Sequence, residues 1–592
     1  MKILQRNEQR VEDTWDLGSL YESVEAWETA RGEVEKRIVK APQLKGMLLK
    51  GKESFITAMR WYEETMLLIE QVYSYAFLSW STDASDSDAT RIYSLATDAY
   101  TRLSTALAFF AVELLEVDEE TIAAYLEDPA FTDYAIFIKK ARHLKPYVLS
   151  EAEERLLAMQ SNAATTARTV FSDLTNVDFD FGEVDGKPLS QSTFSSFLMS
   201  EDGELRKRAY TQFYGVYDQH KHTLARLYEG QVKQDLFRSG ARGYQSARQM
   251  ALYGDDVPLT VYDSLIESVR EAFPILHRYY ALRAKALGLT ELGHWDVYVP
   301  LVEGIKAHTP YEKAVEIISE ALQVLGDEYV HTLTEGLTTA RWVDRYENKG
   351  KRSGAFSSGS FIGKPYILLN YKEDVLRDLF TVAHEGGHSM HSYYSSKNNP
   401  FLHYDYTIFE AEVASTFNEQ LVAKHMIETA ADDRMKAFII AKQLDDIVAT
   451  LFRQTMFAEF ELNIHRKAEA GEPVTLKLIR EEYGSLQRAY FGPNVSFLES
   501  SDLEGLRIPH FYSPFYVYKY ATGLSAAIAL SKSVMEGTSQ ERDRYLAFLK
   551  SGGSKYPIDS LKEAGVDMST PDPVREAIKS FAALIDQFEA LL

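Results

Sequence analysis

Apolar residues recur every three or four positions along most of this chain, and this spacing restricts the fold more than any other feature of the sequence. The pattern runs between charged residues through long segments at 54–82, 90–115, 260–288, 310–337 and 432–469. On a helix, such spacing gathers the apolar side chains on one face, which must be buried against another element. The sequence therefore predicts a mainly α fold.

Strand patterns are few. Residues 177–181 alternate between apolar and acidic side chains, and the turn-forming pair Asp185-Gly186 follows them, which predicts a hairpin. A second strand is predicted at 366–371, after a loop rich in Gly and Ser at 353–360. We expect that strand to belong to a small sheet beside the next helix and to offer an edge to an extended peptide.

A change of pattern near residues 175–205 suggests a boundary within the chain. We expect an N-terminal helical lobe over residues 1–200 and a catalytic domain over residues 201–592, a division that the length of the chain allows.

The segment 378–394 has helical spacing and contains the motif His-Glu-Gly-Gly-His at 384–388. Residues four apart lie on the same helix face about one turn apart, so the imidazoles of His384 and His388 can reach one metal ion. Glu385 lies beside them and can accept a proton from a metal-bound water. This arrangement is typical of zinc hydrolases.

The context of the motif strengthens this interpretation. Three of the 14 histidines, His384, His388 and His391, fall close together in this helix. The adjacent Gly386 and Gly387 each cost about 1 kcal/mol of helix stability relative to Ala. Such a cost suggests a helix that another backbone or a substrate must approach closely. We expect His391 to orient a neighbour or to contact substrate.

The third metal ligand must be sought elsewhere in the chain. The sequence has no Cys, so the donors have to be His or carboxylate. One class of zinc peptidases requires Gly at position 391 and His at position 394, where this chain has His391 and Tyr394. The remaining solution is a carboxylate from a second helix, which we expect at 408–427, with Asp405 or Thr407 as its cap.

Three glutamates of that second helix compete for the role. Glu410 and Glu412 lie about 200° apart around a helix and cannot both face the metal. Glu412, Ser415, Thr416 and Glu419 form one polar stripe on an otherwise apolar helix. A polar stripe suits a metal ligand together with the groups that orient it. We therefore predict Glu412 as the third ligand and Glu419 as a supporting residue.

Composition excludes several kinds of partner. A net charge of −23 disfavours binding to nucleic acid or to anionic membranes. The first residues lack the apolar core of a signal peptide, and the most apolar stretch, 107–117, is too short to span a bilayer. We expect a cytoplasmic enzyme.

At this point the sequence resembles a known family. The segments 384–391 (HEGGHSMH) and 409–419 (FEAEVASTFNE) are similar to the oligoendopeptidase F branch of the thimet oligopeptidase family of zinc metallopeptidases. Residues 14–17 (TWDL) and 507–512 (RIPHFY) are similar to the same branch, so the resemblance spans nearly the whole chain.

The resemblance implies a fold, a substrate class and further site residues. It implies a helical ellipsoid whose two lobes enclose a deep channel, with one zinc ion on the channel floor. It also implies cleavage of internal bonds in short peptides rather than in folded proteins. A C-terminal cluster contains His510, Tyr512, Tyr516, Tyr518 and Tyr520; comparison with the substrate-binding positions of the family suggests His510, Tyr512 and Tyr518 as donors to the oxyanion.

Two other functions stay open from the sequence. A helical zinc carboxypeptidase can share the same motif and a channel. A non-catalytic helical protein that binds peptides could retain the motif without its activity, although the intact set of His384, Glu385, His388 and Glu412 argues against this.

Overall fold

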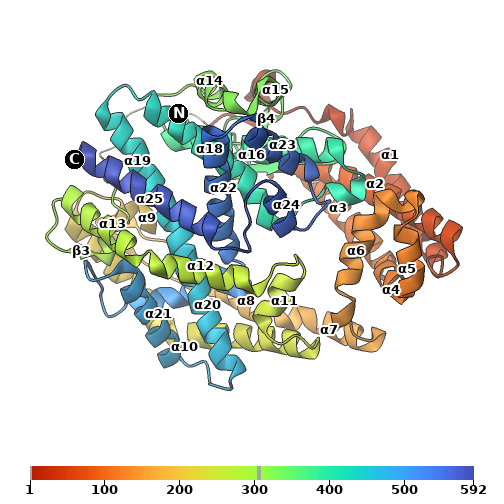
Figure 1. The fold of residues 1–592 in the computed structure, drawn as a ribbon, viewed down its shortest axis with the longest axis horizontal. Coiled ribbons are helices and arrows are strands. Elements are labelled where there is room, and N and C mark those ends of the chain that lie inside the picture. The colour runs from red at the N-terminus through yellow and green to blue at the C-terminus, as the bar shows by residue number, and fades with distance from the viewer. Residues whose placement is uncertain (1–2, 303–307) are drawn as a thin grey trace. The chain divides into compact units, whose positions relative to one another are not determined.

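The fold is mainly helical with a few short strands, as predicted (Figure 1). We describe residues 3–302 and 308–592 in a computed structural model of the chain. The residues group into two compact units, each built from three separated stretches of the chain. Within the described residues, none of the helices combines the length and the apolar character that crossing a bilayer requires.

The first unit comprises Met1–Pro146, Lys306–Met426 and Leu530–Val566. Its helices and strands are α1 (Val24–Lys40), α2 (Lys52–Thr82), α3 (Ser87–Ala106), α4 (Ala108–Glu116), α5 (Glu119–Leu126), α6 (Ala135–His143), α14 (Tyr311–Ala321), α15 (Asp327–Leu337), β4 (Val343–Asp344), β5 (Phe356–Ser358), β6 (Tyr366–Leu368), α16 (Leu376–Asn398), α17 (Phe401–Tyr404), α18 (Ile408–Glu428), α23 (Ser539–Ser551) and α24 (Pro557–Glu563).

The second unit comprises Tyr147–Ile305, Ile427–Ala529 and Asp567–Leu592. Its helices and strands are α7 (Glu151–Ala164), α8 (Thr166–Asp173), β1 (Glu183–Val184), β2 (Lys187–Pro188), α9 (Phe194–Leu198), α10 (Gly203–Ala241), α11 (Ala247–Tyr253), α12 (Leu259–Glu271), α13 (Phe273–Ala286), β3 (Leu292–Gly293), α19 (Asp433–Ile447), α20 (Arg453–Glu469), α21 (Leu476–Phe491), β7 (Val495–Ser496), α22 (Tyr518–Glu536, of which residues 530–536 belong to the first unit) and α25 (Asp572–Leu591).

Each unit contains residues from both sides of residue 200, so the units do not follow the order of the chain. The predicted division into residues 1–200 and 201–592 stays a prediction, and so do the two lobes and the channel.

The core of the first unit supports the sheet beside the motif helix. Trp27 of α1 is fully buried and donates its indole N–H to the carbonyl of Val72 in α2 at 2.8 Å. Tyr366 and Leu368 of β6 pack into the same apolar cluster as these helices. The sheet has the order β4-β6-β5, and α16 packs against β5 and β6. The predicted small sheet beside the motif helix is therefore present, and the N-terminal helices hold it in place.

The core of the second unit is rich in aromatic rings. Helix α10 runs for 39 residues, and Phe213 on its buried face stacks on Phe194 at 3.8 Å and on Phe181 at 4.6 Å. Stacked rings bury a large apolar area in a fixed geometry. The high aromatic content of the sequence is thus used in part to pack this helix.

Three of the segments with continuous helical spacing each form two helices. The segment 260–288 breaks at Ala272, where α13 begins with Pro274 in its first turn, because proline has no N–H to continue the preceding helix. The segment 310–337 breaks at Gly326, which has a φ of +91° that side chains disfavour. The segment 90–115 breaks at Leu107. The apolar spacing continues across all three breaks, so it could not reveal them.

The strand prediction at 177–181 was wrong. Residues 174–178 form a π-helical turn, and the hairpin strands β1 and β2 directly flank Asp185-Gly186. Both turn residues have positive φ, 52° and 72°, as this kind of turn requires. The turn signal was thus correct and the strand was misplaced, because alternation of apolar and acidic residues also fits a short helical turn.

Helices α16 and α18 approach so closely that Gly387 is required between them. A Cβ atom at Gly387 would lie 2.4 Å from the carbonyl oxygen of Ala414 and 2.6 Å from the Cα of Ser415. Both atoms belong to the backbone of α18 and cannot swing aside. At Gly386, a Cβ atom would meet only the end of the flexible Leu333 side chain, at 3.2 Å.

We predict opposite results for alanine at these two adjacent glycines. Gly387→Ala should lower stability by about 1–3 kcal/mol or more, because the added methyl pushes two helices apart. Gly386→Ala should be tolerated, because the gain in helix propensity offsets a small shift of Leu333. Thermal unfolding midpoints of both variants measure this difference, and equal midpoints would contradict the proposed contact.

Candidate metal site

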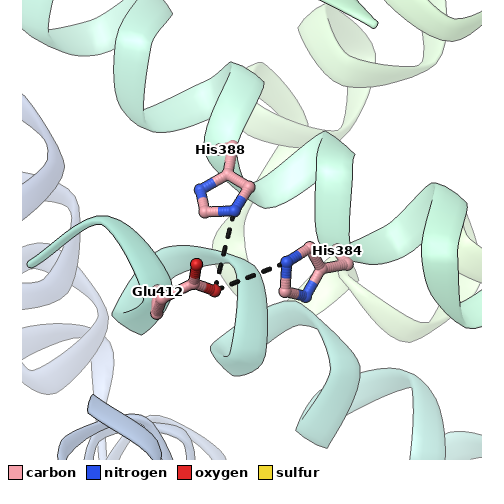
Figure 2. Close-up of side chains that lie close together, drawn as sticks. All are labelled: His384, His388 and Glu412. Atoms are coloured by element: carbon pink, nitrogen blue, oxygen red, sulfur yellow. Dashed lines mark ion pairs between the residues drawn. The ribbon is translucent and has the colours of Figure 1, made fainter. Parts of the chain in front are cut away.

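Two imidazoles and one carboxylate converge on a single point between α16 and α18. Each of His384, His388 and Glu412 offers a ligand atom, and these atoms all lie within 4.8 Å of one another. The Oε2 atom of Glu412 lies 3.5 Å from Nε2 of His384 and 3.8 Å from Nε2 of His388. Figure 2 shows the three side chains pointing toward one another.

These separations fit a metal ion. A tetrahedral ion with bonds of about 2.1 Å holds its ligand atoms roughly 3.4 Å apart. The donor set of two imidazole nitrogens and one carboxylate oxygen is the set that catalytic zinc sites use when they keep a fourth position open for water. The residues present therefore fit the ion that the sequence predicts.

The ring of His384 is oriented by Glu419. Its Nδ1 atom lies 2.8 Å from Oε1 of Glu419, so Nδ1–H donates to that carboxylate and Nε2 is left to face Glu412. The ring of His388 lies next to the backbone of Ala411, and its Nε2 also faces Glu412. Both rings thus direct one nitrogen at the same point, and the other nitrogen of His384 has a partner that orients its ring.

Without a cation, the two rings differ in charge. Burial lowers the pKa of His384, but the hydrogen bond and the charge of Glu419 outweigh it and raise the pKa to about 9. Burial and the charge of His384 lower the pKa of His388 to about 3. The proton on His384 thus offsets part of the negative charge of the surrounding carboxylates. A bound metal ion would replace that proton and add further positive charge.

Glu385 has the environment of a base that works near neutral pH. Its side chain is only 7% exposed, and burial raises its pKa to about 7. The backbone of Ser357 in β5 lies next to this carboxylate and partly offsets the rise of its pKa. A base whose pKa lies near the working pH is best matched to taking up and releasing a proton.

Glu410 faces away from the metal group, as its position on the helix predicted. Its Oε2 accepts hydrogen bonds from the backbone N–H and the hydroxyl of Thr407, at 3.3 and 3.1 Å. Glu410 therefore caps the start of α18 in the manner of a capping box. The fully buried carboxylate of Glu410 is therefore occupied at the start of the helix and does not compete with Glu412 for the ion.

A pocket of about 560 Å³ opens beside the metal group. Strand β5 lines it together with His384, Glu385, His388 and Glu412. The segment predicted as a loop over 353–360 therefore contains a strand. Because β6 is hydrogen-bonded on both sides, to β4 and β5, it cannot accept a further strand, and the prediction that 366–371 offers an edge was wrong. The edge strand at the pocket is β5.

The structure also reveals pocket residues that the sequence did not single out. Tyr404, Asp405 and Tyr406 also line the pocket. The hydroxyl of Tyr406 hydrogen-bonds to Ser392 at 2.9 Å, and its ring stacks on the fully buried His391 at 3.6 Å. His391 thus supports a wall of the pocket. The run of two tyrosines around an aspartate was visible in the sequence, but nothing there placed it at the site.

The predicted oxyanion donors all belong to the second unit. The ring of His510 lies parallel to that of Tyr516 at 6.2 Å. Tyr512 stacks on Phe171 at 4.5 Å, and Tyr518 is fully buried beside Tyr262. Each is thus held by aromatic neighbours within its own unit. Their roles stay predictions.

The chain is similar to known peptidases over most of its length. Residues 196–580 match Peptidase family M3, and residues 113–181 match the family described as Oligopeptidase F. The chain is 43% identical to an oligoendopeptidase F homolog of Borreliella burgdorferi, over 100% of both chains, and 40% identical to oligopeptidase PepF of Bacillus subtilis, over 99% of this chain and 88% of the relative.

Solved structures give the same result. The fold matches a putative peptidase from Chlamydophila abortus with a TM-score of 0.94 and 35% identity, over 100% of both chains. It matches oligoendopeptidase-F from Enterococcus faecium with a TM-score of 0.74 and 31% identity, over 95% of this chain and 98% of that one.

Removing the charge of Glu419 should weaken metal binding. We expect Glu419→Gln to lower the affinity for zinc by about 10- to 100-fold, because the His384 ring loses the partner that orients and polarises it. Competition against a coloured chelator measures this affinity. Glu116→Gln, which removes an equal charge from an exposed position at the end of α4, should leave it unchanged. Equal affinities of the two variants would show that Glu419 has no such role.

Proposed function

Because this chain belongs to peptidase family M3, a family of metallopeptidases, we propose that it is a zinc-dependent endopeptidase that hydrolyses internal bonds of short peptides. The observation that carries this proposal is the convergence of His384, His388 and Glu412 in one pocket with Glu385. A cytoplasmic location stays a prediction.

The proposed ligands are His384, His388 and Glu412, and the proposed base is Glu385. A zinc ion held there would act as a Lewis acid and bring the pKa of a coordinated water toward neutrality. Glu385 accepts a proton from the attacking water at its carboxylate and delivers it to the nitrogen of the leaving amine. Its pKa of about 7 lies close to that of such a water, so the carboxylate can take up this proton and then release it to the more basic amine.

Strand β5 is the proposed support for the peptide backbone. An extended peptide can pair with the free edge of β5 through main-chain hydrogen bonds, which do not depend on side-chain identity. The backbone of Ser357 lies next to the carboxylate of Glu385, so this strand and the proposed base are neighbours. Pairing would therefore align the scissile bond with Glu385 for many different sequences.

We also propose His510, Tyr512 and Tyr518 as donors to the oxyanion of the tetrahedral intermediate, in line with the resemblance to the family. A hydrogen bond to charge that develops only in the transition state lowers the barrier without tightening substrate binding. Removal of one such hydroxyl should therefore act on kcat more than on KM.

The substrate class can be tested with a short, internally quenched peptide that is acetylated at its N-terminus and amidated at its C-terminus. We expect the purified protein to carry about one zinc per chain and to cleave this peptide at an internal bond, with loss of activity on chelation and recovery on addition of zinc. Mass spectrometry of the products locates the cut.

Each alternative has its own outcome in that experiment. A carboxypeptidase would require a free C-terminus and would leave the blocked peptide intact. A non-catalytic peptide-binding protein would bind the peptide with or without metal and release it uncut.

Replacing the base should separate metal binding from catalysis. We expect Glu385→Gln to retain zinc but to lose about 100- to 10,000-fold in kcat, because the amide cannot accept the proton. Glu116→Gln serves as the control for charge. Near wild-type turnover by Glu385→Gln would show that the base is another residue. In the same assay, Tyr512→Phe and Tyr518→Phe identify which hydroxyl, if either, affects kcat.

A further inference from the structure

The pocket contains one carboxylate that the proposed mechanism does not use. Asp405 follows α17 and lines the pocket together with Tyr404 and Tyr406. Glu412 has a role as a ligand and Glu385 has a role as a base. Asp405 has neither, yet it faces the same space.

The backbone that carries Asp405 is held firmly. The carbonyl of Tyr404 accepts a hydrogen bond from the Ser395 hydroxyl, and the phenol of Tyr404 donates to the buried carboxylate of Glu70. On the other side, Tyr406 is fixed by Ser392. The chain also packs so tightly at this point that a Cβ atom on Gly553 would come within 1.9 Å of the Asp405 carbonyl oxygen. The backbone on both sides of Asp405 is therefore held in place where this residue lines the pocket.

The Asp405 carboxylate has no partner of its own. Among the residues that the structure describes, none donates a hydrogen bond to it or lies within ion-pair distance of it. Neighbouring atoms raise the pKa of its carboxyl by burial although the residue itself is exposed, and the charge of Lys140 lowers this pKa. Lys140 does not line the pocket, and its ammonium is bound to the carbonyl of Gly553 at 2.6 Å.

The charges in the pocket do not balance once the site is loaded. A divalent ion with two neutral imidazoles and Glu412 has a net charge of +1, and Glu385 cancels it. Glu419, which hydrogen-bonds to His384, and Asp405 then leave an excess of negative charge, and no Lys or Arg is present among the residues that line the pocket. A carboxylate that lines such a pocket without an ion-pair partner favours a cationic ligand.

The pocket also has room for such a ligand. Its lining includes small residues, among them Ser358, Gly359 and Ala411, and the aromatic residues Tyr404 and Tyr406. Aromatic faces attract ammonium and guanidinium groups and also cover the apolar stem of a long basic side chain.

Building on the proposed function, we propose that Asp405 is a specificity-determining residue that binds a cationic group of the peptide substrate near the scissile bond. The cation is either a Lys or Arg side chain or the free N-terminal ammonium of a short peptide. Both sources offer the same chemistry, a positively charged nitrogen that donates hydrogen bonds to a carboxylate.

The test compares kcat/KM for matched peptides. In one series, a blocked peptide carries Lys, norleucine or Glu at each position around the cleavage site in turn. In the other, a neutral peptide has either a free or an acetylated N-terminus. We expect the wild-type protein to prefer the cation in one series by about 10- to 100-fold, the range of a hydrogen-bonded charge pair. The series that shows the preference identifies the source of the cation.

Asp405→Asn should reduce that ratio to near one, because the amide keeps the size of the side chain and removes its charge. Asp405→Lys should favour the peptide with Glu instead, which a merely structural role could not produce. Glu116→Gln should keep the wild-type ratio, and the zinc content and thermal midpoint of each variant verify folding.

The inference is overturned if the wild-type protein prefers neither cation, or if Asp405→Asn retains the preference. Failure of the proposed function is a distinct result, since the wild-type protein would then leave even the neutral blocked peptide uncut.

Discussion

The contact between the backbones of α16 and α18 at Gly387 is the constraint on which the site depends. A carboxylate on α18 can meet two imidazoles on α16 only if the helices approach more closely than side chains normally allow. Two adjacent glycines in the middle of a helix are unfavourable by themselves. Only Gly387 faces the neighbouring backbone. The loss of helix stability at this glycine therefore permits a metal site that two helices share.

Three carboxylates within three turns of α18 make different contacts. Glu410 caps the helix and is fully buried, Glu412 faces the two imidazoles, and Glu419 orients the His384 ring. Their angular positions on the helix separate these tasks, because residues two apart point in nearly opposite directions and residues seven apart point the same way. The result is a site in which negative charge surrounds the imidazoles and favours a bound cation over a proton.

Much of this could be predicted from the sequence. The spacing of His384, Glu385 and His388 predicted a group on one helix face, and the polar stripe distinguished Glu412 from Glu410. The same reasoning failed where a local pattern has two physical explanations. Apolar spacing continued through Ala272 and Gly326, where helices end, and residues 177–181 form the end of a π-helical turn and an irregular segment rather than a strand.

The sequence by itself determined the helical character of the chain and the residues of two helices that are able to hold a metal ion, because these depend on the spacing of residues along each helix. Only the tertiary structure decided which strand is free at the edge of the sheet, which glycine faces another backbone and which residues form the pocket wall at Tyr404–Tyr406. These depend on contacts between segments far apart in the chain, such as Tyr404 with Glu70 and Asp405 with Gly553, and no local pattern encodes such contacts.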